Sequence, residues 1–184
     1  PITILTGAHR CEFPHRRRHT MQAITVLPTR PGSARLDDIP DPSPEGGVLV
    51  ETMAVGVCGT DVEIVEGLYG VPPPARERLV LGHESLGRVL DSPAEGNLAA
   101  GDLVVGIVRK PDPVPCRSCA VGEWDMCRNG LYTERGIKER HGYCSERFRI
   151  EPEFLVKLDP SLGMLGVLLE PASVLAKAWE HIEH

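Results

Sequence analysis

The sequence has few aromatic residues, no long apolar run and no excess of basic residues. Aromatic side chains make up 4% of the 184 residues, and the 20 lysines and arginines are outnumbered by 26 aspartates and glutamates. The formal net charge of −6 argues against a nucleic-acid-binding protein, which is usually basic. The longest apolar runs, such as residues 103–108, have the length of a strand, and none approaches the roughly 20 apolar residues of a membrane span.

The first 20 residues lack the apolar segment of a secretory signal. Three consecutive arginines, residues 16–18, are followed by polar residues. An alternating apolar pattern begins only at Met21, so we expect residues 1–20 to be a leader or an upstream extension of the reading frame, without ordered structure. A basic arm that contacts nucleic acid is the alternative interpretation of the arginines. Without a secretory signal, we expect the protein to be cytoplasmic.

Glycine (19) and proline (17) are plentiful, which favours short elements joined by turns. Alternating apolar residues predict short strands, which we place at residues 21–27, 47–57, 79–89, 103–108, 143–150 and 155–158. We expect a turn at residues 38–47, a short helical turn at 62–66 and a helix from Leu162 onward. Pro171 fits that helix only near its start. The predicted fold class is therefore mainly β.

Residues 109–142 form a long polar excursion that contains three of the six cysteines. Cys116 and Cys119 are separated by two residues, and Cys127 follows after seven more. A loop of this length inside a compact domain usually needs a function or its own stabilising link. Closely spaced cysteines in a chain without a secretory signal indicate a metal site before disulfides.

A second set of metal-binding residue types is spread along the chain. Cys58, the pair His83-Glu84 and Glu170 offer a thiolate, an imidazole and carboxylates, and this combination suits zinc better than magnesium. A catalytic zinc typically has three protein ligands and one open position. Each residue alone is weak evidence, because a lone cysteine is usually a core residue and a lone histidine is usually packed or solvated.

The sequence segments around these residues are stronger evidence than the single residues. The segments GVCGTD at residues 56–61, GHE at 82–84 and GDLV at 101–104 occur in this order, with Gly87 after the second. Together they resemble the zinc-containing medium-chain dehydrogenase/reductase family over about residues 21–184. The resemblance implies a GroES-like irregular β-barrel catalytic domain with a structural-zinc-type lobe at residues 109–142 and a C-terminal helical segment.

The resemblance also implies roles for individual residues. Cys58 and His83 would bind the catalytic zinc, and Glu84 would either bind it or support it from close by. Glu170, in the sequence LEP, resembles the carboxylate of the polyol and glucose branches; its alternative role is a carboxylate at a helix start. Thr60 resembles the hydroxyl residue that contacts the substrate alcohol and starts a proton relay. Its alternative role is to stabilise the turn after a glycine.

The lobe departs from the family pattern at one position. The family has four cysteines there, and Cys116, Cys119 and Cys127 match the last three. The position of the first falls at Pro113, which cannot bind a metal, and Asp112 is the nearest candidate for the fourth ligand. An empty lobe with three free thiols is the alternative. Of the other cysteines, Cys144 is expected in the core, and Cys11 lies in the expected leader.

The segments EWDMCRNG at residues 123–130, TERGI at 133–137 and HGY at 141–143 resemble the glucose dehydrogenase branch. There the glutamate at the position of Glu134 hydrogen-bonds a sugar hydroxyl, which is a reasonable task for a strong acceptor. A solvated surface carboxylate is the alternative for Glu134. The branch implies an enzyme that oxidises the C1 hydroxyl of an aldose such as glucose, with Zn and NAD(P) as cofactors.

The chain contains no GxGxxG motif for a dinucleotide. We therefore expect it to end before the Rossmann domain of the family, to have no cofactor-binding residues, and to be inactive alone. Oligomer contacts would come with that missing domain. The expected partner is a small sugar or alcohol, not a nucleic acid or a membrane. A polyol, threonine or simple alcohol dehydrogenase is one alternative, and a non-catalytic zinc-binding module is another.

Overall fold

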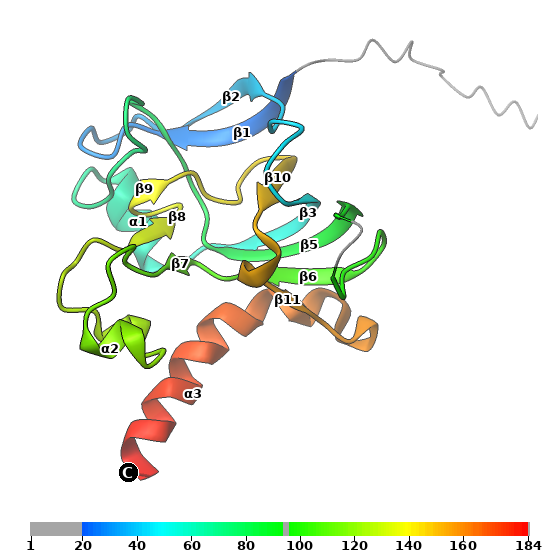
Figure 1. The fold of residues 1–184 in the computed structure, drawn as a ribbon. Coiled ribbons are helices and arrows are strands. Elements are labelled where there is room, and N and C mark those ends of the chain that lie inside the picture. Colours follow the sequence, from blue (N-terminus) through cyan, green and yellow to red (C-terminus); the bar gives the residue numbers. More distant parts are fainter. Residues whose placement is uncertain (1–19, 94–95, 184) are drawn as a thin grey trace, which may run out of the picture.

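The computed structural model describes residues 20–93 and 96–183, and strands dominate it (Figure 1). The largest sheet has the order β10-β3-β5-β6-β11. Its strands are β3 (Val48–Gly56), β5 (Glu84–Asp91), β6 (Leu103–Gly106), β10 (Arg147–Ile150) and β11 (Leu155–Lys157). The mainly β architecture expected from the sequence is confirmed.

Two smaller sheets flank the central one. The first has the order β2-β1-β4 and is formed by β1 (Thr20–Val26), β2 (Arg35–Pro40) and β4 (Leu79–Val80). The second has the order β7-β8-β9 and is formed by β7 (Arg109–Lys110), β8 (Thr133–Arg135) and β9 (Glu139–Arg140). This second sheet lies at the base of the lobe (residues 109–142) and connects it to the rest of the β structure.

Alternation along the strands produces the core. In β1, Met21 and Ala23 are buried whereas Gln22 and Ile24 are exposed, as period-2 patterning requires. The main apolar cluster joins strands β3, β5, β6 and β10 with the segment before β10. Its buried members are Val48, Val50, Val89, Leu98, Val104, Tyr143, Phe148, Ile150 and Phe154.

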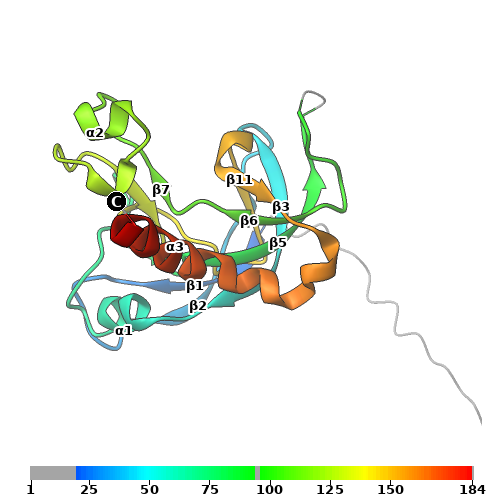
Figure 2. The ribbon, with the colours of Figure 1, turned by 90° about the horizontal axis from the view of Figure 1, so that it is seen from below.

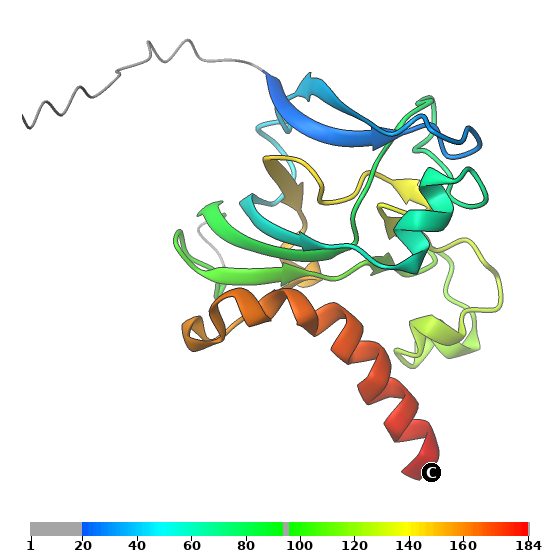
Figure 3. The same ribbon diagram turned by 180° about the vertical axis from the view of Figure 1, so that it is seen from behind.

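The helices lie at the edges of this β body. They are α1 (Gly59–Val65), α2 (Arg117–Ala120) and α3 (Leu169–Glu183), with 3-10 segments η1 (Trp124–Met126), η2 (Pro152–Phe154) and η3 (Pro160–Leu168). Figures 1 and 2 show η3 and α3 passing along the central sheet toward the lobe that carries α2. Seen from behind, α1 lies on the same side of the molecule as the end of β1 (Figure 3).

Several element boundaries differ from those expected. The segment 79–89 is divided into β4 and β5, because Gly82 adopts a positive φ of 87° between them. Leu162 does not begin an α-helix: Gly163 has φ 47° and ψ −131°, so η3 precedes α3. Pro171 lies in the first turn of α3, as expected. The expected turn at 38–47 begins later, because β2 continues to Pro40.

Two expectations concern the chain ends. The expected leader, residues 1–20, lies outside the described residues apart from Thr20, with which β1 begins, and Cys11 lies outside them too. The helical stretch Pro160–Glu180 is long and apolar enough, by length and composition alone, to cross a membrane. The sequence analysis did not single this stretch out. The sequence pattern hid this stretch because Glu170 and Lys177 interrupt its apolar runs.

Candidate metal and substrate site

A cavity of about 860 Å³ lies between the end of β6, the lobe and α3. It gathers residues that the sequence predicted for two different tasks, metal binding and substrate binding. The predicted residues on its wall are Cys58, Thr60, His83, Glu84, Glu134 and Glu170. These residues span more than a hundred positions in the sequence. The fold therefore brings the predicted metal-binding and substrate-binding residues, which come from separate motifs, to one cavity.

Strand pairing places the first metal-binding group. In the β3–β5 ladder Gly56 is opposite Glu84, which brings Cys58, two residues after β3, beside His83, the residue before β5. A Cβ at Gly56 would lie 2.0 Å from Glu84 Oε2, so this position must be glycine for the Glu84 side chain to occupy its place. Cys58 is the N-cap of α1, and its backbone N–H donates to Asp61 Oδ2 at 3.1 Å.

The three donor groups are close enough to share one ion. Cys58 Sγ lies 3.2 Å from His83 Nε2, and ligand atoms of Cys58, His83 and Glu84 all lie within 4.8 Å of one another. Zinc bonds of about 2.3 Å to sulfur and about 2.0 Å to nitrogen place two such atoms about 3.5 Å apart in tetrahedral geometry. The thiolate–imidazole–carboxylate set therefore fits zinc in chemistry and in spacing.

Asp61 faces the ring nitrogen of His83 that does not face Cys58. Its Oδ1 lies 3.6 Å from His83 Nδ1, and both atoms are buried without a hydrogen bond at normal length. Burial opposes a charge on His83, yet Asp61 and Cys58 together raise the pKa of His83 to about 9. A carboxylate facing the second ring nitrogen is the usual arrangement around a metal-bound histidine.

Glu170 and Thr60 line the same cavity without joining the group of three. Glu170 comes from the first turn of α3. Burial raises the pKa of Glu170, and the nearby charges of Glu84 and Asp61 add to this effect. The structure thus places Glu170 within electrostatic reach of the metal-binding group, but outside its inner cluster.

Glu134 is buried on the lobe side of the cavity, where it pairs with an arginine. Arg109 Nε and Nη2 donate to Glu134 Oε1 at 3.0 and 2.7 Å. The solvated-surface alternative for Glu134 does not hold, because the residue is only 8% exposed.

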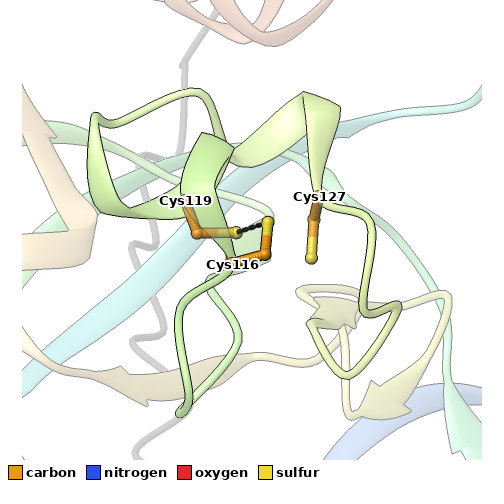
Figure 4. A group of neighbouring side chains, drawn as sticks. All are labelled: Cys116, Cys119 and Cys127. Atoms are coloured by element: carbon orange, nitrogen blue, oxygen red, sulfur yellow. Dashed lines mark hydrogen bonds between the residues drawn. The ribbon is translucent and has the colours of Figure 1, made fainter.

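The lobe holds the second cysteine group (Figure 4). Ligand atoms of Cys116, Cys119 and Cys127 lie within 4.8 Å of one another, and the sulfurs of Cys116 and Cys119 are 3.7 Å apart. Two thiolates on one tetrahedral zinc lie about 3.8 Å apart. The backbone N–H of Arg128 is the largest of several influences that lower the pKa of Cys116 to about 6. Asp112 is buried, with its Oδ2 4.0 Å from Cys127 Sγ.

These arrangements match a known family. The profile of the alcohol dehydrogenase GroES-like domain matches residues 44–160. The chain belongs to this GroES-like domain family. It is 41% identical over 162 residues to glucose 1-dehydrogenase of Methanocella arvoryzae, and 42% identical over 162 residues to that of Thermoproteus tenax. Each alignment covers 87% of this chain and 45% of the relative, so the chain spans about half the length of these relatives.

Solved structures show the same likeness for this GroES-like domain. A Haloferax mediterranei glucose dehydrogenase in complex with NADP, Zn and gluconolactone superposes with a TM-score of 0.78 at 40% identity. That superposition covers 88% of this chain and 45% of the other. The alcohol dehydrogenase of Aeropyrum pernix superposes with a TM-score of 0.64 at 25% identity, covering 80% and 42%. The resemblance to the medium-chain dehydrogenases and their glucose branch is therefore confirmed.

Sequence reasoning missed three residues in or next to the cavity. Asp61 is part of the GVCGTD segment, but the sequence analysis gave it no role. A carboxylate three residues after a metal-binding cysteine could have indicated that it supports the site. Arg109 and Lys177 line the cavity. Their positions follow from strand register and from the path of α3, for which the sequence carries no local signal.

Proposed function

We propose that this chain provides the metal- and substrate-binding part of a zinc-dependent dehydrogenase that oxidises the C1 hydroxyl of an aldose such as glucose with NAD(P). One observation carries the proposal: Cys58, His83 and Glu84 converge on the wall of a cavity that is also lined by the buried Glu134. Free thiols at the cysteines of the described ranges suit a cytoplasmic location.

The relatives support the choice of substrate. Glucose 1-dehydrogenases from several archaea are 41–42% identical to this chain. The Haloferax protein was solved with NADP, Zn and gluconolactone, and the last of these is glucose oxidised at C1. A small-alcohol pocket would gain nothing from the additional carboxylates of Glu134 and Glu170.

The residues present would divide the work as follows. Cys58, His83 and Glu84 would hold zinc, with Glu170 as a second carboxylate nearby. Zinc, when bound, supplies Lewis-acid chemistry that lowers the pKa of a bound hydroxyl. Thr60 accepts the proton of the substrate hydroxyl at its Oγ1 and passes its own outward. Glu134 accepts a hydrogen bond from another sugar hydroxyl and so orients the ring. We assign no residue of this chain to the nicotinamide cofactor.

The lobe would bind a second, structural zinc through Cys116, Cys119 and Cys127. A structural zinc site usually has four ligands. Asp112 is the proposed fourth ligand, because the Asp112 carboxylate lies beside Cys127. Residues 109–142 would then be a lobe stabilised by its own metal.

Metal analysis of the zinc-loaded chain tests both sites. We expect two zinc ions per chain, one in Cys58→Ser and one in Cys127→Ser. Wild-type chain that retains a single ion, lost only in Cys127→Ser, would remove the catalytic proposal and leave a non-catalytic zinc-binding module.

Cobalt substitution tests the substrate. With Co²⁺ at the Cys58 site of the Cys127→Ser variant, the visible spectrum reports directly on the inner coordination shell. We expect glucose to change this spectrum at lower concentration than sorbitol, threonine or ethanol do. A spectrum that responds to ethanol or sorbitol but not to glucose would assign the chain to another branch of the family.

A further inference from the structure

Part of the cavity wall comes from the lobe segment that joins two of the proposed metal-binding cysteines. This bridging segment, residues 120–126, runs from Cys119 to Cys127. Its residues on the cavity wall are Gly122, Trp124 and Asp125. Both ends of the segment are therefore attached to the cysteine cluster (Figure 4).

The bridging segment and the helix before it have almost no apolar core of their own. α2 has four residues and η1 has three, whereas isolated helices below about 12 residues are marginal in water. In residues 117–126 only Cys119 is buried, and Val121 and Met126 are 73% and 47% exposed. Small units that bury so little apolar surface usually need a disulfide or a metal to keep one conformation.

Hydrogen bonds connect the cavity residues of the bridging segment directly to the cysteines. The backbone N–H of Gly122 donates to the Cys119 carbonyl at 3.2 Å, and that of Cys127 donates to the Trp124 carbonyl at 3.2 Å. A displacement of either cysteine would therefore move the backbone of a residue on the cavity wall.

Two neighbouring residues connect the bridging segment to the rest of the molecule. Glu123 Oε2 lies 2.6 Å from Lys177 Nζ on α3, and the side chains of this pair are 42% and 31% exposed, so its stabilising effect is small. The ring of Trp124 lies 6.3 Å from that of Phe154, centroid to centroid, and its carbonyl accepts from Arg109 at 3.1 Å. These contacts set where the segment lies, and the cysteine cluster is left as the main constraint on its shape.

We propose that Cys116, Cys119 and Cys127, by holding one ion together, position the bridging segment for sugar binding and so couple the lobe to the cavity. They are positioning residues, because they act on the sugar through the cavity residues between them. A coupling free energy is reciprocal, so the sugar must raise the affinity of the lobe for its metal by the same factor. The inference rests on the proposed function and adds a second site that controls substrate affinity.

Hydrogen exchange of the zinc-loaded chain tests the first step without any sugar. The amides of Gly122 and Met126 donate within the lobe. They should exchange about 10-fold faster or more in Cys127→Ser and in Cys116→Ser, because the segment opens locally when the cluster loses its ion. Amides of β5 should exchange as in wild type. Unchanged exchange at Gly122 and Met126 would overturn the inference.

Ligand-observed NMR tests the coupling to the cavity. We expect Cys127→Ser and Cys116→Ser each to weaken glucose binding by about 10-fold, while both keep the zinc at the Cys58 site. Leu131→Ser is the matched control: Leu131 is an exposed lobe residue outside the cavity wall and the bridging segment, so zinc content and glucose affinity should both stay at the wild-type values.

The reciprocal measurement uses wild type alone, so it decides the inference even if the serine variants fold poorly. In the cadmium-loaded chain, cadmium NMR separates the three-thiolate ion of the lobe from the ion at Cys58, and a chelator titration then follows the lobe by itself. Saturating glucose should raise the cadmium affinity of the lobe by about 10-fold. A metal that only stabilised the lobe would not respond to the sugar.

The outcomes distinguish the two proposals. If wild type binds glucose but the lobe affinity ignores the sugar, or well-folded serine variants bind glucose as wild type does, the coupling is overturned while the proposed function stands. If zinc-loaded wild type binds no aldose at all, the proposed function falls and the inference falls with it.

Discussion

The two ring nitrogens of His83 face different partners. Nε2 points to Cys58 Sγ at 3.2 Å, and Nδ1 points to the buried Asp61 at 3.6 Å. Asp61 also accepts the backbone N–H of Cys58, so one carboxylate organises both metal-binding residues. The hydrogen bond from the backbone N–H of the N-cap residue Cys58 to Asp61 also explains why α1 begins at Gly59.

We expect Asp61→Asn to weaken zinc binding at the Cys58 site by about 10–100-fold, because the amide keeps the cap but loses the charge that faces His83. Competition with a chromophoric chelator, in a Cys127→Ser background that leaves one site, measures the affinity. Asp102→Asn is the control, since Asp102 pairs with Lys157 at the edge of the sheet. Equal affinity of Asp61→Asn and wild type would show that Asp61 has no influence on the metal.

Glu151 is the most strongly paired carboxylate outside the cavity. It lies 2.7 Å from Lys110 Nζ and 3.1 Å from Arg140 Nη2. Burial acts to raise the pKa of Glu151, but these cations lower it from 4.5 to about 2. Because the folded pKa is the lower one, the ionised pair stabilises the protein above pH 4.5, and this contribution is lost as the pH falls toward 2.

Glu151→Gln should therefore lower the free energy of unfolding by about 1–2 kcal/mol at pH 7. The shift alone would correspond to roughly 3 kcal/mol, but the partly exposed carboxylate is screened by solvent. Urea unfolding of both proteins between pH 7 and pH 3 measures the difference, which should shrink below pH 4.5. A difference that grows on acidification would contradict the assignment.

At the scale of elements, the bend that presents His83 depends on three glycines in contact. A Cβ at Gly136 would lie 2.4 Å from the Gly82 carbonyl oxygen, and a Cβ at Gly142 would lie 2.3 Å from the carbonyl oxygens of both Gly82 and Leu81. The backbone N–H of Tyr143 donates to the same Gly82 carbonyl at 2.9 Å. The segment before β5 is thus fixed by backbone against backbone, with no side chain between.

We expect Gly142→Ala to destabilise the chain by about 2–3 kcal/mol, because the methyl group meets main-chain atoms that cannot turn aside. The displaced Leu81–Gly82 backbone should also weaken zinc binding at His83. Urea unfolding with and without zinc measures both effects. Gly59→Ala is the matched control, since a Cβ there meets nothing within 4 Å although Gly59 adjoins Cys58. A wild-type unfolding midpoint in Gly142→Ala would show that the close approach is unimportant.

Elements with a strong local pattern were predicted well. The alternation from Met21 defines β1, and the run ending at Gly56 defines β3. The helix expected from Leu162 was placed too early, because composition alone does not show that Gly163 leaves the helical region. The strand expected at 143–150 was too long: residues 142–144 bond to the turn before β5, so the ladder with β3 starts only at Arg147.

At the scale of the whole molecule, α3 is held to the lobe by an ion pair. Lys177 Nζ lies 2.6 Å from Glu123 Oε2 and 3.6 Å from Glu180 on the next turn. Lys177 lines the cavity, so this contact joins α3 to the lobe at a wall of the cavity. Several apolar residues on the same helix are exposed, including Leu175 and Ile182, so few apolar contacts assist the ion pair.

We expect Lys177→Met to speed amide hydrogen exchange in α3 at low salt, and this difference should disappear near 1 M NaCl, where exposed charges are screened. Glu123→Gln should have the same effect, and the double variant should add little. Lys157→Met, which removes an ion pair at the sheet edge, serves as the control. Identical exchange in α3 for wild type and Lys177→Met would show that the ion pair does not hold the helix.

The sequence by itself determined the donor types and their order, the mainly β class and the cysteine spacing of the lobe, because each of these depends on residues close together in the chain. Only the tertiary structure decided that Arg109 lies opposite Glu134, that Asp112 reaches Cys127 from one residue before the expected position, and that α3 lines the cavity with Lys177. Such contacts follow from strand register and from the packing of distant segments. Both are sums of many weak interactions over the whole chain, and no single motif encodes them.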